Sequence, residues 1–269
     1  MVQTNTKERT EEQGTPQDTK SDEYLIHGEH ITKRFSNGKV KALSDVDFYV
    51  RPNEIVGMLG DNGAGKSTLV KILNGFHTLD EGQLYFEGKK VHFNSPKDAR
   101  DAGIETAYQN LALVNLMSIS RNFFLGRELT KRILGFPLLD RKAMDKIAAK
   151  SLGEVGLENI RAMHEAVNFL SGGERQAIAI SRSTYFGARL LILDEPTAAL
   201  SVKETEWVLR LVHEAKENGL SVILISHNAY EAYEVAERFV VLQHGENYAN
   251  VKREDTNPKE LIEIIAGRK

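Results

Sequence analysis

A glycine-rich segment at residues 60–68 carries the residue types that bind phosphate groups. It fits the pattern G-x-x-x-x-G-K-[ST] at every fixed position. Glycines there let backbone N–H groups approach phosphate oxygens. Lys66 can reach the β- and γ-phosphates of a nucleotide, and the Ser67 hydroxyl can bind Mg²⁺. The segment therefore predicts a nucleotide site formed by Gly60, Asp61, Asn62, Gly63, Ala64, Gly65, Lys66, Ser67 and Thr68.

The residues on both sides of this segment favour the same interpretation. The apolar run at 54–59 has the pattern of a buried strand, and apolar residues at 69–73 are spaced for one face of a helix. A helix that begins at the loop adds a partial positive charge for an anion. The alternative is a chance match in a glycine-rich turn, which the strand, loop and helix context disfavours.

A second set of chemical residues follows two other apolar runs. Asp194 and Glu195 end the run at 190–193, and His227 follows another one at 222–226. In an open α/β sheet, ligands gather at the carboxyl ends of the strands, so these side chains are expected beside the phosphate loop. Asp194 would hold Mg²⁺, and Glu195 would orient or deprotonate the attacking water. A pair of acids that merely leaves a strand is the alternative.

Two further side chains have weaker support as catalytic groups. Gln109 ends a short strand candidate, and its amide could contact Mg²⁺ or the water at the γ-phosphate. An isolated glutamine at a strand end carries little functional information. His227 could donate a hydrogen bond to a γ-phosphate oxygen or simply end a strand at the solvent boundary.

The elements that must position these residues predict an α/β fold with a mostly parallel sheet. The continuous apolar runs at 190–193 and 222–225 suit strands covered on both faces. A helix is expected between them at 202–217, with a capping box of Ser201 and Glu204. Pro258 starts a terminal helix, and 239–251 has the pattern of a last hairpin.

The amino-terminal half predicts an antiparallel part, and the middle of the chain predicts helices. Residues 24–50 suggest two strands around an Asn-Gly turn at 36–39. Phe35 precedes the turn and either packs in the hairpin or stacks on a nucleotide base. The pattern from about 110 to 187 is mostly helical. Residues 1–22 are polar and predict a disordered tail.

Composition limits the classes of function that fit this chain. It has 269 residues, a formal net charge of −3 and no cysteine. The charge provides no global attraction for nucleic acid, and disulfides and thiolate metal sites are excluded. No apolar run approaches the roughly 18 residues that a membrane span needs. The protein is therefore expected to associate with a membrane only through a partner.

Taken together, these motifs make the chain resemble the nucleotide-binding subunit of ATP-binding cassette (ABC) transporters over about residues 24–250. The Leu-Ser-Gly-Gly-Glu-Arg-Gln segment at 170–176 is the most specific feature. The resemblance implies an ABC domain at 23–254 with a helical subdomain at about 110–187, followed by a C-terminal helix at 255–269. It also implies that Phe35 stacks on the base, and that Gln109 and His227 contact the γ-phosphate region.

The signature segment implies a second copy of the chain. Ser171, Gly172 and Gly173 can expose backbone N–H groups at a helix start, which would form another anion site. By the resemblance, these residues and Gln176 close over ATP held by another subunit, so that a homodimer binds two ATP molecules. The alternative is an ordinary glycine loop before a helix.

Within the ABC family, the closest likeness is to monosaccharide importers. Residues 114–128, which end in Phe-Leu-Gly-Arg-Glu, and residues 197–204 carry this likeness. It implies an ATPase at the cytoplasmic face of the cell membrane, bound to a permease and served indirectly by a periplasmic or extracellular sugar-binding protein. Ser201 stands where the wider family commonly has Asp, so no role is transferred to it.

Three rival functions remain open at this stage. The signature does not separate a sugar importer from an amino acid importer or an exporter cassette. A soluble ABC ATPase acting on DNA or ribosomes usually has a coiled-coil insertion, zinc modules or a second cassette, and none is evident here. A phosphate-loop kinase or GTPase-like switch would have no use for the Leu-Ser-Gly-Gly helix start.

Overall fold

A computed structural model describes residues 23–109, 112–157 and 163–268. The predicted polar tail at 1–22 lies outside these residues, and its expected disorder stays a prediction. None of the helices in the described part of the chain is long and apolar enough to cross a bilayer.

A six-stranded sheet forms the centre of the fold, with the order β12-β11-β3-β10-β9-β6. Neighbouring strands from β11 to β6 pair in parallel, whereas β12 pairs antiparallel to β11 at one edge. This arrangement confirms the predicted mostly parallel α/β sheet and the last hairpin. The strands are β3 (Ile55–Leu59), β6 (Ile104–Ala107), β9 (Leu190–Asp194), β10 (Ser221–Ile225), β11 (Arg238–Gln243) and β12 (Glu246–Lys252).

Both faces of the central sheet are buried, because successive side chains of a strand point to opposite sides. In β9, Leu191 and Leu193 join one apolar cluster, whereas Leu190 and Ile192 join another. Side chains of α3–α8 complete the first cluster, and α1, α2 and a second sheet complete the second. The helices are α1 (Lys66–Leu73), α2 (Pro96–Ala102), α3 (Ile119–Phe123), α4 (Arg141–Glu154), α5 (Gly172–Tyr185), α6 (Val202–Glu217), α7 (Ala229–Val235) and α8 (Pro258–Ile265).

The second sheet is antiparallel, with the order β2-β1-β4-β5. Its strands are β1 (Ile26–Phe35), β2 (Val40–Val50), β4 (Glu81–Phe86) and β5 (Lys89–Val91). β1 and β2 form the predicted hairpin, and Ser36 and Asn37 have φ values of 54° at its turn. The capping boxes of α6 and of α5 are also present.

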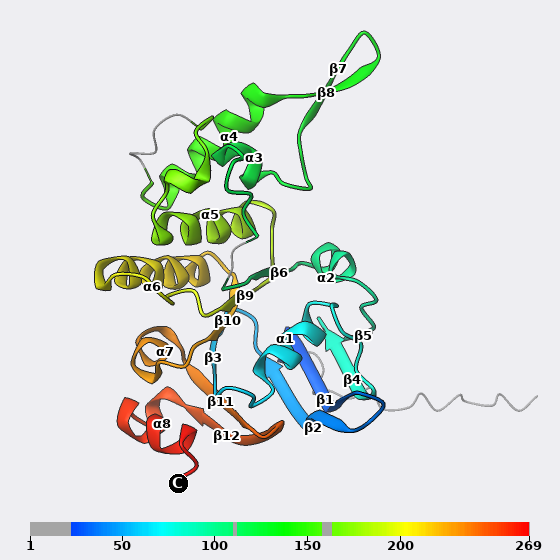
Figure 1. The fold of residues 1–269 in the computed structure, drawn as a ribbon, viewed down its shortest axis with the longest axis vertical. Coiled ribbons are helices and arrows are strands. Elements are labelled where there is room, and N and C mark those ends of the chain that lie inside the picture. The colour runs from blue at the N-terminus through cyan, green and yellow to red at the C-terminus, as the bar shows by residue number, and fades with distance from the viewer. Residues whose placement is uncertain (1–22, 110–111, 158–162, 269) are drawn as a thin grey trace, which may run out of the picture.

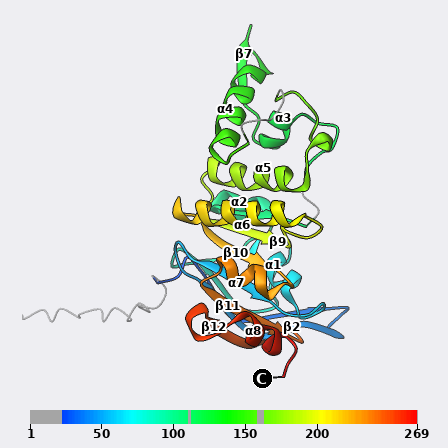
Figure 2. The same ribbon diagram turned by 90° about the vertical axis from the view of Figure 1, so that its left-hand side faces the viewer.

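The helices α3, α4 and α5 stand together at one end of the molecule, far from the C-terminus (Figures 1 and 2). Within this segment a small hairpin, β7 (Thr130–Ile133) and β8 (Phe136–Leu139), projects beyond the helices (Figure 1). The sequence analysis did not predict it. All of its residues are exposed, including Leu134 at 94% in the turn, so no buried face imposes an alternating pattern.

A buried ion pair joins the two sheets. The Arg238 side chain is 3% exposed and donates from Nε and Nη2 to the Glu54 carboxylate at 2.8 and 3.0 Å. Nη2 also donates to the Tyr49 backbone oxygen at 2.8 Å, and Nη1 donates to Asn250 Oδ1 at 3.1 Å. Arg238 therefore connects β2, the start of β3, β11 and β12 through one planar group.

Replacing Arg238 by methionine is expected to destabilise the protein by about 3–5 kcal/mol, because it leaves the buried Glu54 carboxylate without its partner. Urea unfolding followed by circular dichroism measures the change. Combining Arg238→Met with Glu54→Leu should recover much of the loss. Arg34→Ala, which breaks the exposed pair with Glu81, is the control and should cause no measurable change. Equal effects of the two arginine substitutions would contradict this account.

Candidate active site

The phosphate loop and the carboxyl end of β9 meet in one cavity of about 450 Å³. The loop leaves β3 after Leu59 and enters α1 at Lys66, as the sequence predicts. Asp194 and Glu195 lie in the same cavity, although they are far from the loop in the sequence. The cavity is lined by Val40, Lys41, Ala42, Asp61, Asn62, Gly63, Ala64, Gly65, Lys66, Ser67, Thr68, Asp194, Glu195 and His244.

Two glycines of the loop are required by its backbone path. Gly60 has a φ of 141°, and a Cβ there would lie 2.3 Å from the Leu242 backbone oxygen. Gly65 has a φ of 104°, and its Cβ would lie 2.9 Å from the Ala42 backbone oxygen. L-residues rarely adopt such backbone conformations. Gly60 does not line the cavity itself, so its part is to shape the loop.

Lys66 places a buried cation in this loop. Its Nζ donates to the backbone oxygens of Gly60 and Asp61 at 2.5 and 3.1 Å. Burial lowers the pKa of Lys66, against the opposing influence of Glu195 and Asp194. A nucleoside triphosphate in the cavity would supply negative charge, which stabilises the charged form of the partly desolvated ammonium group.

The donor set around Asp194 fits Mg²⁺ bound together with a nucleotide. Burial, followed by the neighbouring Glu195 charge, raises the pKa of Asp194, so a cation would relieve both effects. The Ser67 hydroxyl lines the same cavity. Within the described ranges, no group of three or more His, Cys, Asp or Glu residues is arranged to hold a metal ion by itself. One carboxylate and one hydroxyl suit Mg²⁺, which keeps several waters and takes its remaining ligands from phosphates.

His227 and Gln109 lie near Glu195. His227 Nδ1 is 3.2 Å from Glu195 Oε1. Gln109, Glu195 and His227 all line a neighbouring cavity of about 700 Å³. Gln109 does not line the cavity of the phosphate loop. The structure thus brings the three predicted catalytic side chains together at the carboxyl edge of the sheet.

The signature residues do not line the cavity of the phosphate loop in their own chain. Ser171 caps α5 and accepts a hydrogen bond from Glu174 N at 3.3 Å. Gly172 packs so closely that an added Cβ would lie 2.3 Å from Leu200 Cδ2. Gln176 is 5% exposed and buried inside the subunit, so its predicted contact with nucleotide gains no support here.

Glu204 connects the signature helix α5 to the start of α6. Its carboxylate accepts hydrogen bonds from Ser201 N, Ser201 Oγ and Gly173 N at 3.0, 2.8 and 3.3 Å. These bonds, the backbone bond from Ser201 foremost, lower the pKa of Glu204 to about 2. Ser201 is thus the N-cap of α6, a role that its hydroxyl fills and that the sequence analysis predicted.

Phe35 lies at the end of β1, opposite Val40, which lines the nucleotide cavity. The Phe35 ring is half-buried and meets His77 edge to face, with centroids 5.2 Å apart. Phe35 itself does not line the cavity. Its predicted stacking on a base therefore stays a prediction.

Replacing Phe35 by alanine is expected to weaken ATP binding about 3- to 10-fold, the value of one aromatic stacking contact. Competition by inorganic tripolyphosphate should not change, because that probe has no base. Phe76→Ala is the matched control, since the exposed Phe76 ring also meets His77, at 5.1 Å. If ATP affinity stays unchanged in Phe35→Ala, the ring serves the packing of the hairpin only.

His244, Val40, Lys41 and Ala42 also line the cavity, and the sequence analysis did not identify them. His244 lies in the turn between β11 and β12, where its residue type alone carries no signal. Its neighbour Gly245 packs against the β2 backbone, with an added Cβ 2.7 Å from Ala42 O. In the sequence, Gly245 was the residue that could have indicated the close approach of this turn to β2.

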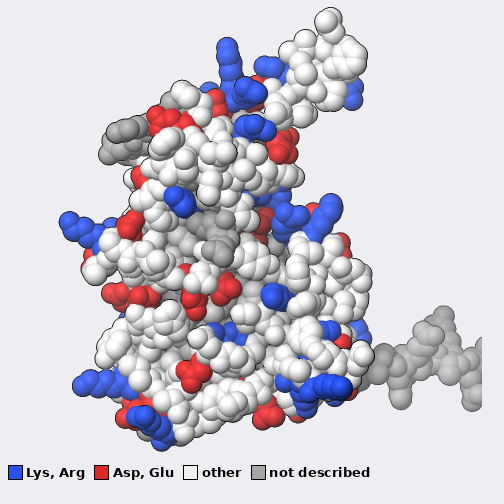
Figure 3. All heavy atoms as spheres, viewed as in Figure 1, with Lys and Arg blue, Asp and Glu red and all other residues white. Residues whose placement is uncertain are grey.

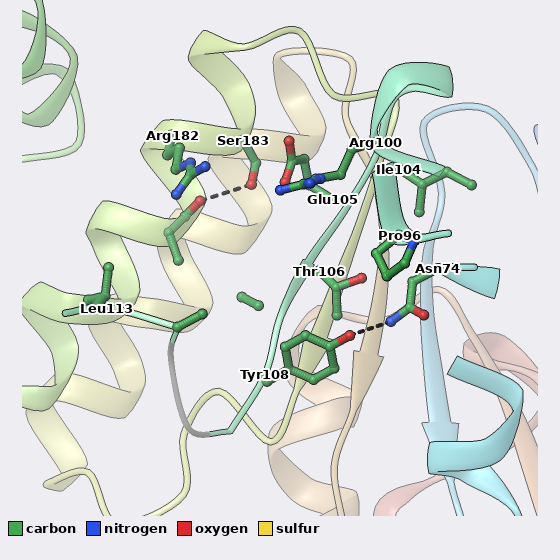
Figure 4. Close-up of a pocket in the computed structure, with 13 residues that line it drawn as sticks. Asn74, Pro96, Arg100, Ile104, Glu105, Thr106, Tyr108, Leu113, Arg182 and Ser183 are labelled. Atoms are coloured by element: carbon green, nitrogen blue, oxygen red, sulfur yellow. Dashed lines mark hydrogen bonds between the residues drawn. The ribbon is translucent and has the colours of Figure 1, made fainter. Parts of the chain in front are cut away.

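A third hollow, of about 240 Å³, lies between α2, β6 and α5 (Figure 4). Tyr108 and Asn74 form one end of it, where Asn74 Nδ2 donates to the Tyr108 oxygen at 2.6 Å. Glu105 and Arg182 bring opposite charges to its other part, and Leu113 adds apolar surface. The hollow is therefore amphipathic, and it shares no lining residue with the cavity of the phosphate loop.

Comparison with known proteins leads to the same family that the sequence motifs indicated. The family model described as "ABC transporter" matches residues 43–198. A xylose/arabinose import ATP-binding protein of Sulfolobus acidocaldarius is 48% identical over 90% of this chain and 93% of its own length. A fructose import ATP-binding protein of Rhizobium meliloti is 44% identical over 92% and 95%. A ribose import ATP-binding protein of Escherichia coli O157:H7 is 38% identical over 91% of this chain and 47% of its own length.

Solved structures share the fold. A dimeric ATP-binding cassette in a post-hydrolysis state, bound to ADP and phosphate, has a TM-score of 0.71 at 25% identity, covering 85% of this chain and 99% of that one. A nucleotide-free ATP-binding cassette of an ABC transporter has a TM-score of 0.76, covering 90% and 98% at 24% identity. The predicted phosphate-loop ATPase core with an antiparallel sheet and a helical segment is thereby confirmed.

Proposed function

The chain belongs to the ABC transporter family, and we propose that it is the ATP-hydrolysing subunit that powers import of a sugar, most simply a monosaccharide. The ATPase activity is inferred from one cavity, which is lined by Lys66, Ser67, Asp194 and Glu195. The observation that carries the sugar is the 44–48% identity, over at least 90% of both chains, to xylose/arabinose and fructose import proteins.

The residues suggest a division of labour in hydrolysis. The backbone of the loop and the Lys66 ammonium hold the phosphates. Asp194 and Ser67 would hold Mg²⁺, which neutralises charge on the β- and γ-phosphates. The Glu195 carboxylate orients the attacking water and accepts its proton. His227, at hydrogen-bond distance from Glu195, contacts the γ-phosphate, and Gln109 contacts the water or the metal.

A homodimer would complete each site. Ser171 and Gly173 lie at the start of α5 and do not reach the nucleotide cavity of their own chain. A second copy facing the first would bring this helix start to the γ-phosphate, where the Gly173 N–H would exchange its bond to Glu204 for one to phosphate. The likeness to a dimeric cassette supports this arrangement. ATP binding would then draw two copies together, and hydrolysis would release them.

A permease would bind on the side of the hollow between α2, β6 and α5 (Figure 4). That hollow combines apolar and charged residues, as an interface that must form and transmit motion requires. The subunit would sit on the cytoplasmic face of the membrane, and a sugar-binding protein outside the cell would deliver the substrate. Figure 3 shows Lys, Arg, Asp and Glu interspersed over one face of the protein, which does not favour a nucleic-acid partner.

The test uses the subunit assembled with its permease in lipid nanodiscs. ATPase activity is measured with the sugar-binding protein plus xylose, arabinose, fructose or ribose. One sugar should stimulate turnover, whereas amino acids should not. Stimulation by an amino acid alone would refute sugar import, and absence of any ATP hydrolysis by the assembled complex would refute the ATPase itself.

A further inference from the structure

One carboxylate outside the assigned catalytic set bridges the two loops that carry Glu195 and His227. Glu231, on α7, accepts a hydrogen bond from Thr197 Oγ1 on its Oε2. Its Oε1 accepts a second bond, from Asn228 Nδ2, at 2.8 Å. Thr197 follows Glu195 by two residues, and Asn228 directly follows His227. The two loops leave different strands, β9 and β10, and they also meet directly where His227 Nδ1 lies 3.2 Å from Glu195 Oε1.

Two residues beside this bridge are buried, and further hydrogen bonds hold the residues after His227. Thr197 is 8% exposed and Ser226 is 3% exposed. The Ser226 hydroxyl accepts from Asn228 N at 3.0 Å, and Asn228 Oδ1 accepts from Tyr230 N at 3.0 Å. Asn228 is thereby fixed as the N-cap of α7 while its amide N–H₂ group reaches Glu231. These bonds hold the backbone directly after His227.

The backbone at Glu195 needs such support. Glu195 has a φ of 51°, a conformation that is unfavourable for a residue with a side chain. Its N–H donates to Ile225 O on β10 at 3.0 Å, and its carbonyl accepts from Ala198 N at 3.1 Å. Beyond these backbone bonds, the Thr197 hydroxyl is the next side-chain anchor along the loop.

We propose that Glu231 is a positioning residue for hydrolysis, which fixes the loop of Glu195 relative to the loop of His227. This inference rests on the proposed ATPase function. A carboxylate suits the task because each of its oxygens accepts one of the two bonds, and bonds to an ionised acceptor are the stronger kind. Both oxygens are engaged by Thr197 and Asn228, so Glu231 acts through its neighbours and not on the phosphate.

The variants Glu231→Gln and Glu231→Ala test this role in the full-length protein. Glutamine keeps the size but replaces the charged acceptor by a neutral amide, and alanine removes both bonds. We expect kcat for ATP to fall about 10- to 100-fold, the effect of a small misplacement of reacting groups, with KM changed less than about 2-fold. Glu263→Gln, which changes an exposed acid on α8, is the control and should keep the wild-type kcat.

A double-mutant cycle adds a readout that a merely structural role would not move. Thr197→Val removes the hydroxyl donor and keeps the shape. Because both substitutions break the same bridge, kcat of Thr197→Val combined with Glu231→Ala should be no lower than that of the worse single variant. Independent, multiplicative losses would overturn the bridge.

Thermal unfolding and ATP binding distinguish the remaining outcomes. Wild-type kcat in Glu231→Gln and Glu231→Ala would overturn the proposal, and so would a lower unfolding temperature with kcat per folded molecule unchanged. Loss of ATP binding in parallel with kcat would also overturn it, because that result indicates a collapsed site. If the wild-type protein itself hydrolyses no ATP, the failure lies with the proposed function and not with Glu231.

Discussion

Replacing Glu195 by glutamine is expected to lower ATP turnover by about 10²–10⁴-fold, the contribution of a positioned general base. Glutamine has the same size as glutamate but does not accept a proton. Lys66, Ser67 and the loop backbone remain in place, so ATP should still bind. In the proposed homodimer, the two copies separate only after hydrolysis, so the variant should accumulate as an ATP-dependent dimer.

Phosphate release and size-exclusion chromatography with light scattering measure the two halves of this prediction. Mg²⁺ and ATP should shift Glu195→Gln to twice the monomer mass, and ADP should not. Glu214→Gln, which changes an exposed acid on α6, is the control and should hydrolyse ATP like the wild type. Near-normal turnover in Glu195→Gln would remove this residue from the mechanism.

Replacing Lys66 by alanine is expected to weaken ATP binding about 10- to 150-fold, because a charged hydrogen bond contributes about 1.5–3 kcal/mol. The loss should be seen with ATP and with tripolyphosphate alike, since the proposed contact of Lys66 is with phosphate and not with the base. Isothermal titration calorimetry measures both affinities. Lys97→Ala, on the exposed surface of α2, is the control.

The same substitution should not lower the stability of the nucleotide-free protein. Burial lowers the pKa of Lys66, so the native state binds this proton less tightly than the unfolded state does. Folding with a charged amine is therefore disfavoured at neutral pH, and stability rises with pH toward the ordinary lysine pKa. Alanine has no charge, so the substitution removes the unfavourable burial of the ammonium group. Unchanged ATP affinity would contradict the placement of the phosphates beside Lys66.

Local sequence rules predicted the elements that hold the site. The glycine pattern gave the phosphate loop because only glycine fits the backbone at Gly60 and Gly65. Ser201 and Glu204 marked the start of α6 through the capping box that the structure contains. Ligands gather at the carboxyl ends of strands. This rule correctly predicted that Asp194 and Glu195 lie beside the phosphate loop, which is more than a hundred residues away in the sequence.

Features that depend on distant partners were not predictable in this way. Glu54 and Arg238 are separated by 184 positions, and neither belongs to a motif. Glu231 has the residue type of an ordinary helix surface, and its bridge appears only when β9 and β10 lie side by side. The hairpin of β7 and β8 buries no face, so the periodicity that identifies strands is missing.

The hairpin of β7 and β8 is also a site where a protease can cut the chain. Strand β7 carries Lys131 and Arg132, which are both exposed, so trypsin should cut there without disturbing the core. Strands β3 and β6 come from before the cut, and β9 to β12 come from after it, yet they alternate in one sheet. Both fragments therefore contribute strands to the same sheet. A molecule cut in the hairpin should stay associated and active until it is denatured.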